Sequence, residues 1–201
     1  GVVGWIDLCA DDVEAVLENY YGTPKLKGFR MLIHDRTDMD FADSTAHLNG
    51  VSLLGKYNFT YDLLLRTIHL PSAIRLVQNL PNQPFVVDHI AKPAMDGSDM
   101  EAWKHGINEI STYPNVMCKL SGLVTEADWI NWHASDFIPY LDFVYEAFGA
   151  DRLMVGSDWP VCTIAADYNT TISIVDDWVS KLSTEEQSLI LGETCAKFYS
   201  V

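Results

Sequence analysis

The sequence has no long run of apolar residues. No stretch approaches the roughly 18 to 20 consecutive apolar residues that a membrane-spanning helix needs. The first residues also lack the basic segment followed by an apolar segment that is typical of a secretory signal. We therefore expect this chain to have no membrane partner and to work in the cytoplasm.

Basic residues are scarce as well. The chain has 13 Lys and Arg against 28 Asp and Glu, which gives a formal net charge of -15 at pH 7. Nucleic acids and anionic membrane surfaces bind proteins by attracting Lys and Arg. The composition therefore argues against nucleic acid as a partner and leaves small molecules as the expected ligands.

Closely spaced cysteines are missing too. The four cysteines lie far apart in the sequence, at Cys9, Cys118, Cys162 and Cys195. They show neither the paired spacing that holds structural zinc nor the density of a disulfide scaffold. Buried free thiols are the expected state, and nothing here indicates redox chemistry.

What the sequence does contain is a strand followed by a helix, repeated six times. The expected strands lie in the apolar, β-branched segments 1–8, 28–34, 61–66, 84–93, 115–122 and 153–158. Their starts recur at intervals of roughly 25 to 37 residues, which suits a helix that crosses back to begin the next parallel strand. The pattern therefore predicts an α/β protein.

The helix signals between these strands are local. Phe137, Leu141, Val144 and Phe148 form one face of the clearest amphipathic helix, and Pro71 suits an early helical position. Ser183 and Glu186 have the spacing of a capping box at the start of a closing helix, which we expect Gly192 to break.

A barrel explains these strands better than a dinucleotide-binding sheet does. Strands that are apolar on both faces belong to a sheet that is covered on both sides, and no glycine-rich phosphate turn is present. A TIM (β/α)8 barrel has eight units in about 250 residues, whereas this chain has six. We therefore predict a single barrel domain over residues 1–201 that is N-terminally incomplete and lacks strands one and two. Its open strand edges make a homo-oligomer one expected outcome.

Ionisable side chains follow several of the predicted strands. Asp158 closely follows the apolar run 153–155, and His89 and Lys92 fall at the end of the fourth strand. In sheets of parallel strands, reactive groups lie just past the carboxyl ends. Asp158 is therefore a candidate catalytic group, although an Asp at this position also commonly caps a turn. His89 has a structural alternative as the hydrogen-bonded partner of Asp88.

Five segments together resemble a known family. They are VGWIDL (3–8), GFR (28–30), DHIAKP (88–93), CKLSGL (118–123) and GSDWPV (156–161). In this order they resemble the amidohydrolase-2 family, specifically its sugar-lactone hydrolase branch of the L-fuconolactonase and L-rhamnonolactonase type. The resemblance extends over essentially the whole chain. It implies a TIM barrel of which strands three to eight are present, and hydrolysis of an aldonolactone to the aldonic acid.

The resemblance also implies roles for individual residues. Asp158 and His89 are the catalytic candidates: Asp158 takes a proton from water and returns it to the leaving ring oxygen, while His89 orients the water or polarises the carbonyl. His89 and Asp158 are also the candidate ligands of a divalent metal such as zinc, although the reaction could equally be metal-independent. The candidate substrate-binding residues are Arg30, Lys92, Lys119 and Trp159.

Several basic residues lie near the ends of predicted strands. Arg30, Arg66, Lys92 and Lys119 are four of only 13 cations in an acidic chain. They predict a local positive region that would suit an anionic aldonate product.

Other functions remain open at this point. The first strand of the family ends in a His-x-His pair, and no His-x-His occurs in this sequence. The alternatives to the lactonase are a metal-dependent decarboxylase or another hydrolase of the same family, and, from a different class, a non-catalytic incomplete barrel.

Overall fold

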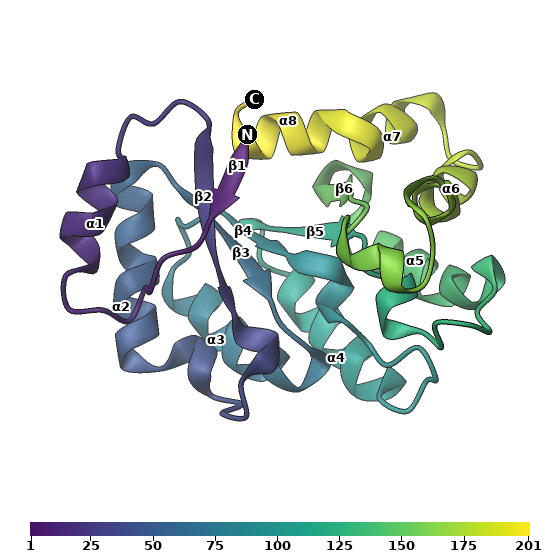
Figure 1. Ribbon diagram of the computed structural model, residues 1–201, viewed down its shortest axis with the longest axis horizontal. Coiled ribbons are helices and arrows are strands. Elements are labelled where there is room, and N and C mark those ends of the chain that lie inside the picture. The colour runs from purple at the N-terminus through teal and green to yellow at the C-terminus, as the bar shows by residue number, and fades with distance from the viewer.

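The computed structural model describes residues 1–201 and contains one sheet of six parallel strands (Figure 1). The strands are β1 (Val2–Gly4), β2 (Leu26–Leu32), β3 (Thr60–Leu64), β4 (Phe85–Val87), β5 (Val116–Leu120) and β6 (Leu153–Val155). Each strand pairs with the next in chain order. This order confirms the predicted α/β fold with six strand-helix units, and it leaves β1 and β6 as the two edge strands.

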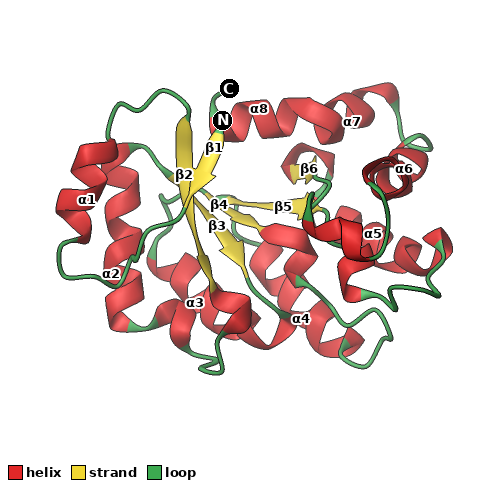
Figure 2. Ribbon diagram, in the orientation of Figure 1, coloured by secondary structure: helices red, strands yellow, loops and turns green.

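Helices surround the strands (Figure 2). They are α1 (Val13–Tyr20), α2 (Thr45–Leu54), α3 (Leu70–Asn79), α4 (Met100–Ser111), α5 (Ala134–Phe148), α6 (Tyr168–Val179), α7 (Thr184–Ser188) and α8 (Thr194–Tyr199). The predicted apolar face of α5 is buried, and Pro71 lies in the first turn of α3 as expected. No helix is both long enough and apolar enough to cross a bilayer.

Alternation along the strands separates two faces of the sheet. On β2, Phe29 and Met31 belong to the main apolar core, whereas Arg30 between them lines a cavity. Successive side chains of a strand point to opposite faces, so the residues between core positions face the concave side. Asp62 on β3 and Lys119 on β5 lie between core residues in the same way.

The C-terminal segment packs against this concave side. Tyr199 of α8 is buried and forms a small apolar cluster with Val86 and Met154. Lys27 Nζ donates to the carbonyl oxygen of Ser200 at 2.9 Å, which ties this segment to β2. Both chain termini lie near β1 in Figure 1, so the C-terminal segment covers part of the opening between the two edge strands.

Three local expectations are corrected by the structure. The first strand covers only Val2–Gly4 of the expected 1–8. Strand β4 ends at Val87 instead of reaching residue 93, because His89 to Lys92 form a left-handed turn. Gly192 does not break the last helix: it lies in a π-helical turn, Leu189–Glu193, that continues into α8. The capping box of Ser183 and Glu186 is confirmed.

The cysteines are free, as predicted. Cys118 and Cys162 are buried, whereas Cys9 and Cys195 are partly exposed.

Candidate active site

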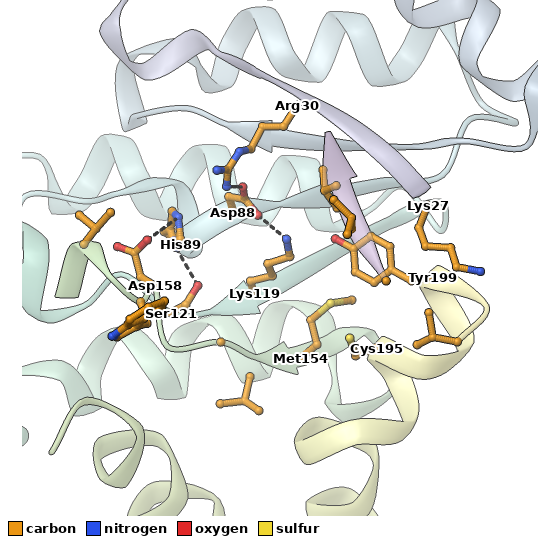
Figure 3. A pocket seen from close by; sticks show the side chains of 18 of the residues that line it. Lys27, Arg30, Asp88, His89, Lys119, Ser121, Met154, Asp158, Cys195 and Tyr199 are labelled. Atoms are coloured by element: carbon orange, nitrogen blue, oxygen red, sulfur yellow. Dashed lines mark hydrogen bonds and ion pairs between the residues drawn. The ribbon is translucent and has the colours of Figure 1, made fainter. Parts of the chain in front are cut away.

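A cavity of about 460 Å³ opens between β1, β2, β6 and the C-terminal segment. Its size lies in the range of small-molecule sites. Five of the six predicted site residues line it, namely Arg30, His89, Lys119, Asp158 and Trp159. Figure 3 shows four of them, of which Arg30 and Lys119 come from β2 and β5, while His89 and Asp158 come from the segments after β4 and β6. The structure therefore brings together groups that are far apart in the sequence.

His89 and Asp158 form the closest pair of titratable groups at one end of the cavity. His89 Nε2 lies 3.4 Å from Asp158 Oδ1, and His89 Nδ1 lies 2.8 Å from Ser121 Oγ. The two side chains are only 9% and 11% exposed. The tautomer with its proton on Nε2 suits both neighbours, because a carboxylate accepts and Nδ1 can then accept from the Ser121 hydroxyl. His89 thus links Ser121 to Asp158.

The second oxygen of Asp158 is less constrained. Thr125 Oγ1 lies 3.5 Å from Asp158 Oδ2, but the same hydroxyl also donates to the carbonyl oxygen of Gly122 at 2.9 Å. A hydroxyl has one proton to donate, and the shorter contact is the stronger. Asp158 Oδ2 therefore has no short hydrogen bond from the protein.

Both residues of this pair, His89 and Asp158, have a left-handed backbone conformation. His89 has φ 54° and Asp158 has φ 57°, conformations that residues other than glycine rarely adopt. Gly122, at φ 66°, packs against the imidazole: a Cβ there would lie 2.6 Å from His89 Cβ. Glycine at position 122 therefore allows the positive φ of this turn and leaves room for the His89 side chain.

Lys119 is the centre of a buried charged network beside the pair. Its Nζ lies 2.6 Å from Asp62 Oδ2 and 2.7 Å from Asp88 Oδ1. Arg30 Nη1 donates to Asp88 Oδ2 at 2.9 Å, and the Tyr199 hydroxyl donates to Asp62 Oδ2 at 2.7 Å. The Asp62 and Asp88 side chains are 1% and 0% exposed, so their charges depend on these partners.

The surroundings set the protonation states. Burial lowers the pKa of His89 more than the charges of Asp88 and Asp158 raise it, so the ring is neutral at neutral pH. Burial also opposes the charge of Lys119, but Asp88 and Asp62 outweigh it and raise its pKa. Burial and the nearby charge of Asp88 raise the pKa of Asp62 to about 6.

All four cations that were predicted near strand ends form ion pairs. Arg30 pairs with Asp88, Lys119 pairs with Asp62 and Asp88, and both remaining cations pair with Glu126. Arg66 and Lys92 share one carboxylate, so the four cations face three carboxylates, Asp62, Asp88 and Glu126. The cavity itself is lined by the basic residues Lys27, Arg30 and Lys119 and by the carboxylates Asp88 and Asp158.

Lys92 is the predicted site residue that does not line the cavity. Its Nζ lies 2.6 Å from Glu126 Oε1, and Glu126 Oε2 accepts from Arg66 Nη1 at 2.7 Å. Lys92 ends the left-handed turn after β4 and faces this carboxylate, so the structure does not bring it into the cavity with the other five.

The donor set does not form a metal centre. His89 and Asp158 supply two donors that face each other, whereas a catalytic zinc site has three protein ligands. No group of three or more His, Cys, Asp or Glu in this chain is arranged to hold a metal ion. We therefore assign no chemical step to a metal.

Sequence reasoning gave Asp62, Ser121 and Tyr199 no role in the site, and it named Asp88 only as a structural partner of His89. A signal existed for Asp62, a carboxylate inside the apolar strand sequence TYDLLL. Charged residues are seldom fully buried unless they are paired, so this position indicated a buried partner. Tyr199 had no such signal, because it lies 137 residues from Asp62 in the chain.

The chain is similar to curated lactonases. The chain is 39% identical over 211 residues to an L-fucono-1,5-lactonase of Burkholderia multivorans, covering 100% of this chain and 71% of the relative. It is 26% identical over 194 residues to an L-rhamnono-gamma-lactonase of Scheffersomyces stipitis, covering 87% of this chain and 56% of that relative.

A solved structure matches the fold closely. The crystal structure of an amidohydrolase from Burkholderia multivorans with bound Zn has a TM-score of 0.92 and 38% sequence identity, and the match covers 100% of this chain and 73% of that one. The family described as Amidohydrolase matches residues 1–201. By its sequence, its six parallel strands and this match over its full length, the chain belongs to the amidohydrolase family.

Proposed function

We propose that the cavity binds a sugar aldonolactone and hydrolyses it to the aldonic acid. The observation that carries this proposal is the buried His89–Asp158 pair at the end of the cavity. The relatives named L-fucono-1,5-lactonase and L-rhamnono-gamma-lactonase support it.

Asp158 supplies the proton transfers in this mechanism. A water beside Asp158 Oδ2 gives up a proton to the carboxylate as its oxygen attacks the lactone carbonyl. The tetrahedral intermediate then collapses, the ring C–O bond breaks, and the proton returns from Asp158 to the leaving ring oxygen. His89 Nε2 holds the other carboxylate oxygen in place, since its neutral ring is fixed by Ser121.

The substrate is held by groups along the cavity. Arg30 is 40% exposed and uses Nη1 on Asp88, so its remaining N–H groups are available to the lactone carbonyl or ring hydroxyls. Trp159 is 64% exposed and forms a wall of the cavity. Because Arg30 and Lys119 are paired with buried carboxylates, they are held in place as hydrogen-bond donors for a hydroxyl-rich lactone.

The setting is also part of the proposal. We place this chemistry in the cytoplasm, which agrees with four free cysteines and no disulfide. The edge strands β1 and β6 offer a route to a homo-oligomer. A zinc ion, as named for the related structure, would need ligands beyond His89 and Asp158.

The proposal is tested by a hydrolysis assay. L-Fucono-1,5-lactone and L-rhamnono-lactone are supplied, and acid release is followed in a weakly buffered solution. The assay is run on this chain and on a chimera that carries the unmatched part of the Burkholderia multivorans lactonase ahead of Gly1, where the resemblance places the first two strands. Hydrolysis by either one supports the proposal.

A pair of variants tests the assignment of Asp158. Asp158→Asn keeps the size of the side chain but removes the base, so kcat should fall by about 100-fold or more while KM changes less. Asp177→Asn, on the exposed face of α6, is the matched control and should leave kcat unchanged. No hydrolysis of any aldonolactone by chain or chimera, or release of carbon dioxide from a carboxylic acid instead, would reject the lactonase.

A further inference from the structure

The turn after β4 has a backbone that requires an explanation. Four consecutive residues, His89, Ile90, Ala91 and Lys92, have φ values of 54°, 46°, 64° and 47°. Residues other than glycine avoid this left-handed region because Cβ crowds the following carbonyl oxygen. A run of four such residues persists only where the surrounding structure holds it, and such outliers concentrate at functional sites.

The indole of Trp103 holds the middle of this turn. Trp103 lies in α4, is 0% exposed and donates from Nε1 to the carbonyl oxygen of Ile90 at 2.7 Å. Its ring packs against Tyr140 and Phe143 of α5, with ring centroids 5.2 and 5.4 Å away. Because Ile90 is itself fully buried, its carbonyl oxygen cannot accept a hydrogen bond from solvent if the indole N–H is removed.

An ion pair holds the end of the turn. Lys92 and Glu126 are each 10% exposed and lie 2.6 Å apart. Glu126 follows Thr125, whose hydroxyl approaches Asp158 at 3.5 Å. The segment that fixes the last residue of the turn thus also touches the partner of His89.

His89 is the first residue of this turn, so the turn decides where its imidazole lies. A change of φ at His89 or Ile90 would swing the imidazole relative to Gly122, Ser121 and Asp158. We propose that Trp103 and the Lys92–Glu126 pair are positioning residues, which hold the left-handed turn and thereby keep His89 Nε2 beside Asp158. The kinetic consequence of this inference rests on the proposed function; the structural consequence does not.

Two Trp→Phe variants provide the main test. Trp103→Phe keeps a ring in the core but removes the N–H that Ile90 needs. Trp178→Phe is the matched control, because Trp178 is also buried and also donates from Nε1 at 2.7 Å, but to Asp142 between α6 and α5. The readouts are kcat and KM on an aldonolactone and the imidazole ¹⁵N signals of His89, assigned with a His89→Gln variant.

Trp103→Phe should lower kcat by roughly 10- to 100-fold with little change in KM, because a misplaced catalytic group slows chemistry more than binding. It should also shift the His89 signals, whereas Trp178→Phe should alter neither. Unchanged His89 signals in a folded Trp103→Phe protein would overturn the inference, as would equal shifts in both variants.

A second pair of variants covers the case in which Trp103→Phe does not fold. Glu126→Gln weakens the hold on Lys92, and Glu14→Gln is its control in the exposed pair with Lys56. The inference expects shifted His89 signals and a lower kcat from the first variant only. If the wild-type protein hydrolyses no lactone, the His89 signals still decide the positioning role, while the proposed function fails by itself.

Discussion

Replacing Lys119 should destabilise the protein in a way that depends on pH. Lys119→Met keeps the length of the side chain but removes the charge that faces Asp62 and Asp88 at 2.6 and 2.7 Å. Both carboxylates are at most 1% exposed, so they cannot recover the loss from water. Removing one partner of a buried ion pair typically costs about 3–5 kcal/mol. For a chain of this size that corresponds to a fall in Tm of about 6–20 °C.

The pH dependence has a defined sign. Lys119 lowers the pKa of both carboxyls, so its removal raises the folded-state pKa of Asp88 and moves that of Asp62 further above its unfolded value. The variant is then most stable below the unfolded-state carboxyl pKa of about 4, and it loses stability as the pH rises through the folded-state pKa. In the wild type, Asp62 already behaves this way, with a folded pKa of about 6. The difference between variant and wild type should therefore be small near pH 4 and largest near pH 8.

Urea unfolding at several pH values measures this effect. Lys56→Met is the control, because Lys56 pairs with Glu14 at the same distance of 2.6 Å but both side chains are more than half exposed. It should change stability little at any pH. Adding Asp62→Asn to Lys119→Met removes one of the two buried carboxylates that have lost their Lys119 partner, and it should restore part of the stability at pH 8. A loss that is equal at pH 4 and pH 8, or no larger than that of Lys56→Met, would refute the reasoning.

Three further changes test the local structure of the site. Ala91→Gly should leave stability unchanged or raise it, because Ala91 has φ 64° and glycine adopts this conformation without strain. The control Ala73→Gly, inside α3, should lower the free energy of unfolding by about 1 kcal/mol, measured by heat or urea. Equal losses in the two variants would argue against the left-handed turn. Gly122→Ala should reduce kcat sharply in the lactone assay, since its Cβ would displace His89, and a crystal structure with His89 unmoved would contradict this. Trp159→Ala should raise KM more than it lowers kcat if the indole is a wall of the lactone site, and an unchanged KM would remove Trp159 from it.

Much of the architecture is determined by short stretches of sequence. The six strand-helix units were predictable because apolar periodicity, a proline such as Pro71 and a cap such as Ser183 act over a few residues. The meeting of His89 and Asp158 was predictable for a related reason. Parallel strands in one sheet bring their carboxyl ends to the same edge, so residues at those ends become neighbours whatever their distance in the chain.

The partner of each charge was decided only by the tertiary structure. Lys92 and Lys119 both lie near strand ends, yet Lys119 faces the cavity and Lys92 faces Glu126. Nothing local distinguishes them, because the difference arises from the left-handed turn, and that turn depends on an indole N–H from α4. Ion pairing is set by the distances between side chains from separate elements, which exist only once those elements have packed.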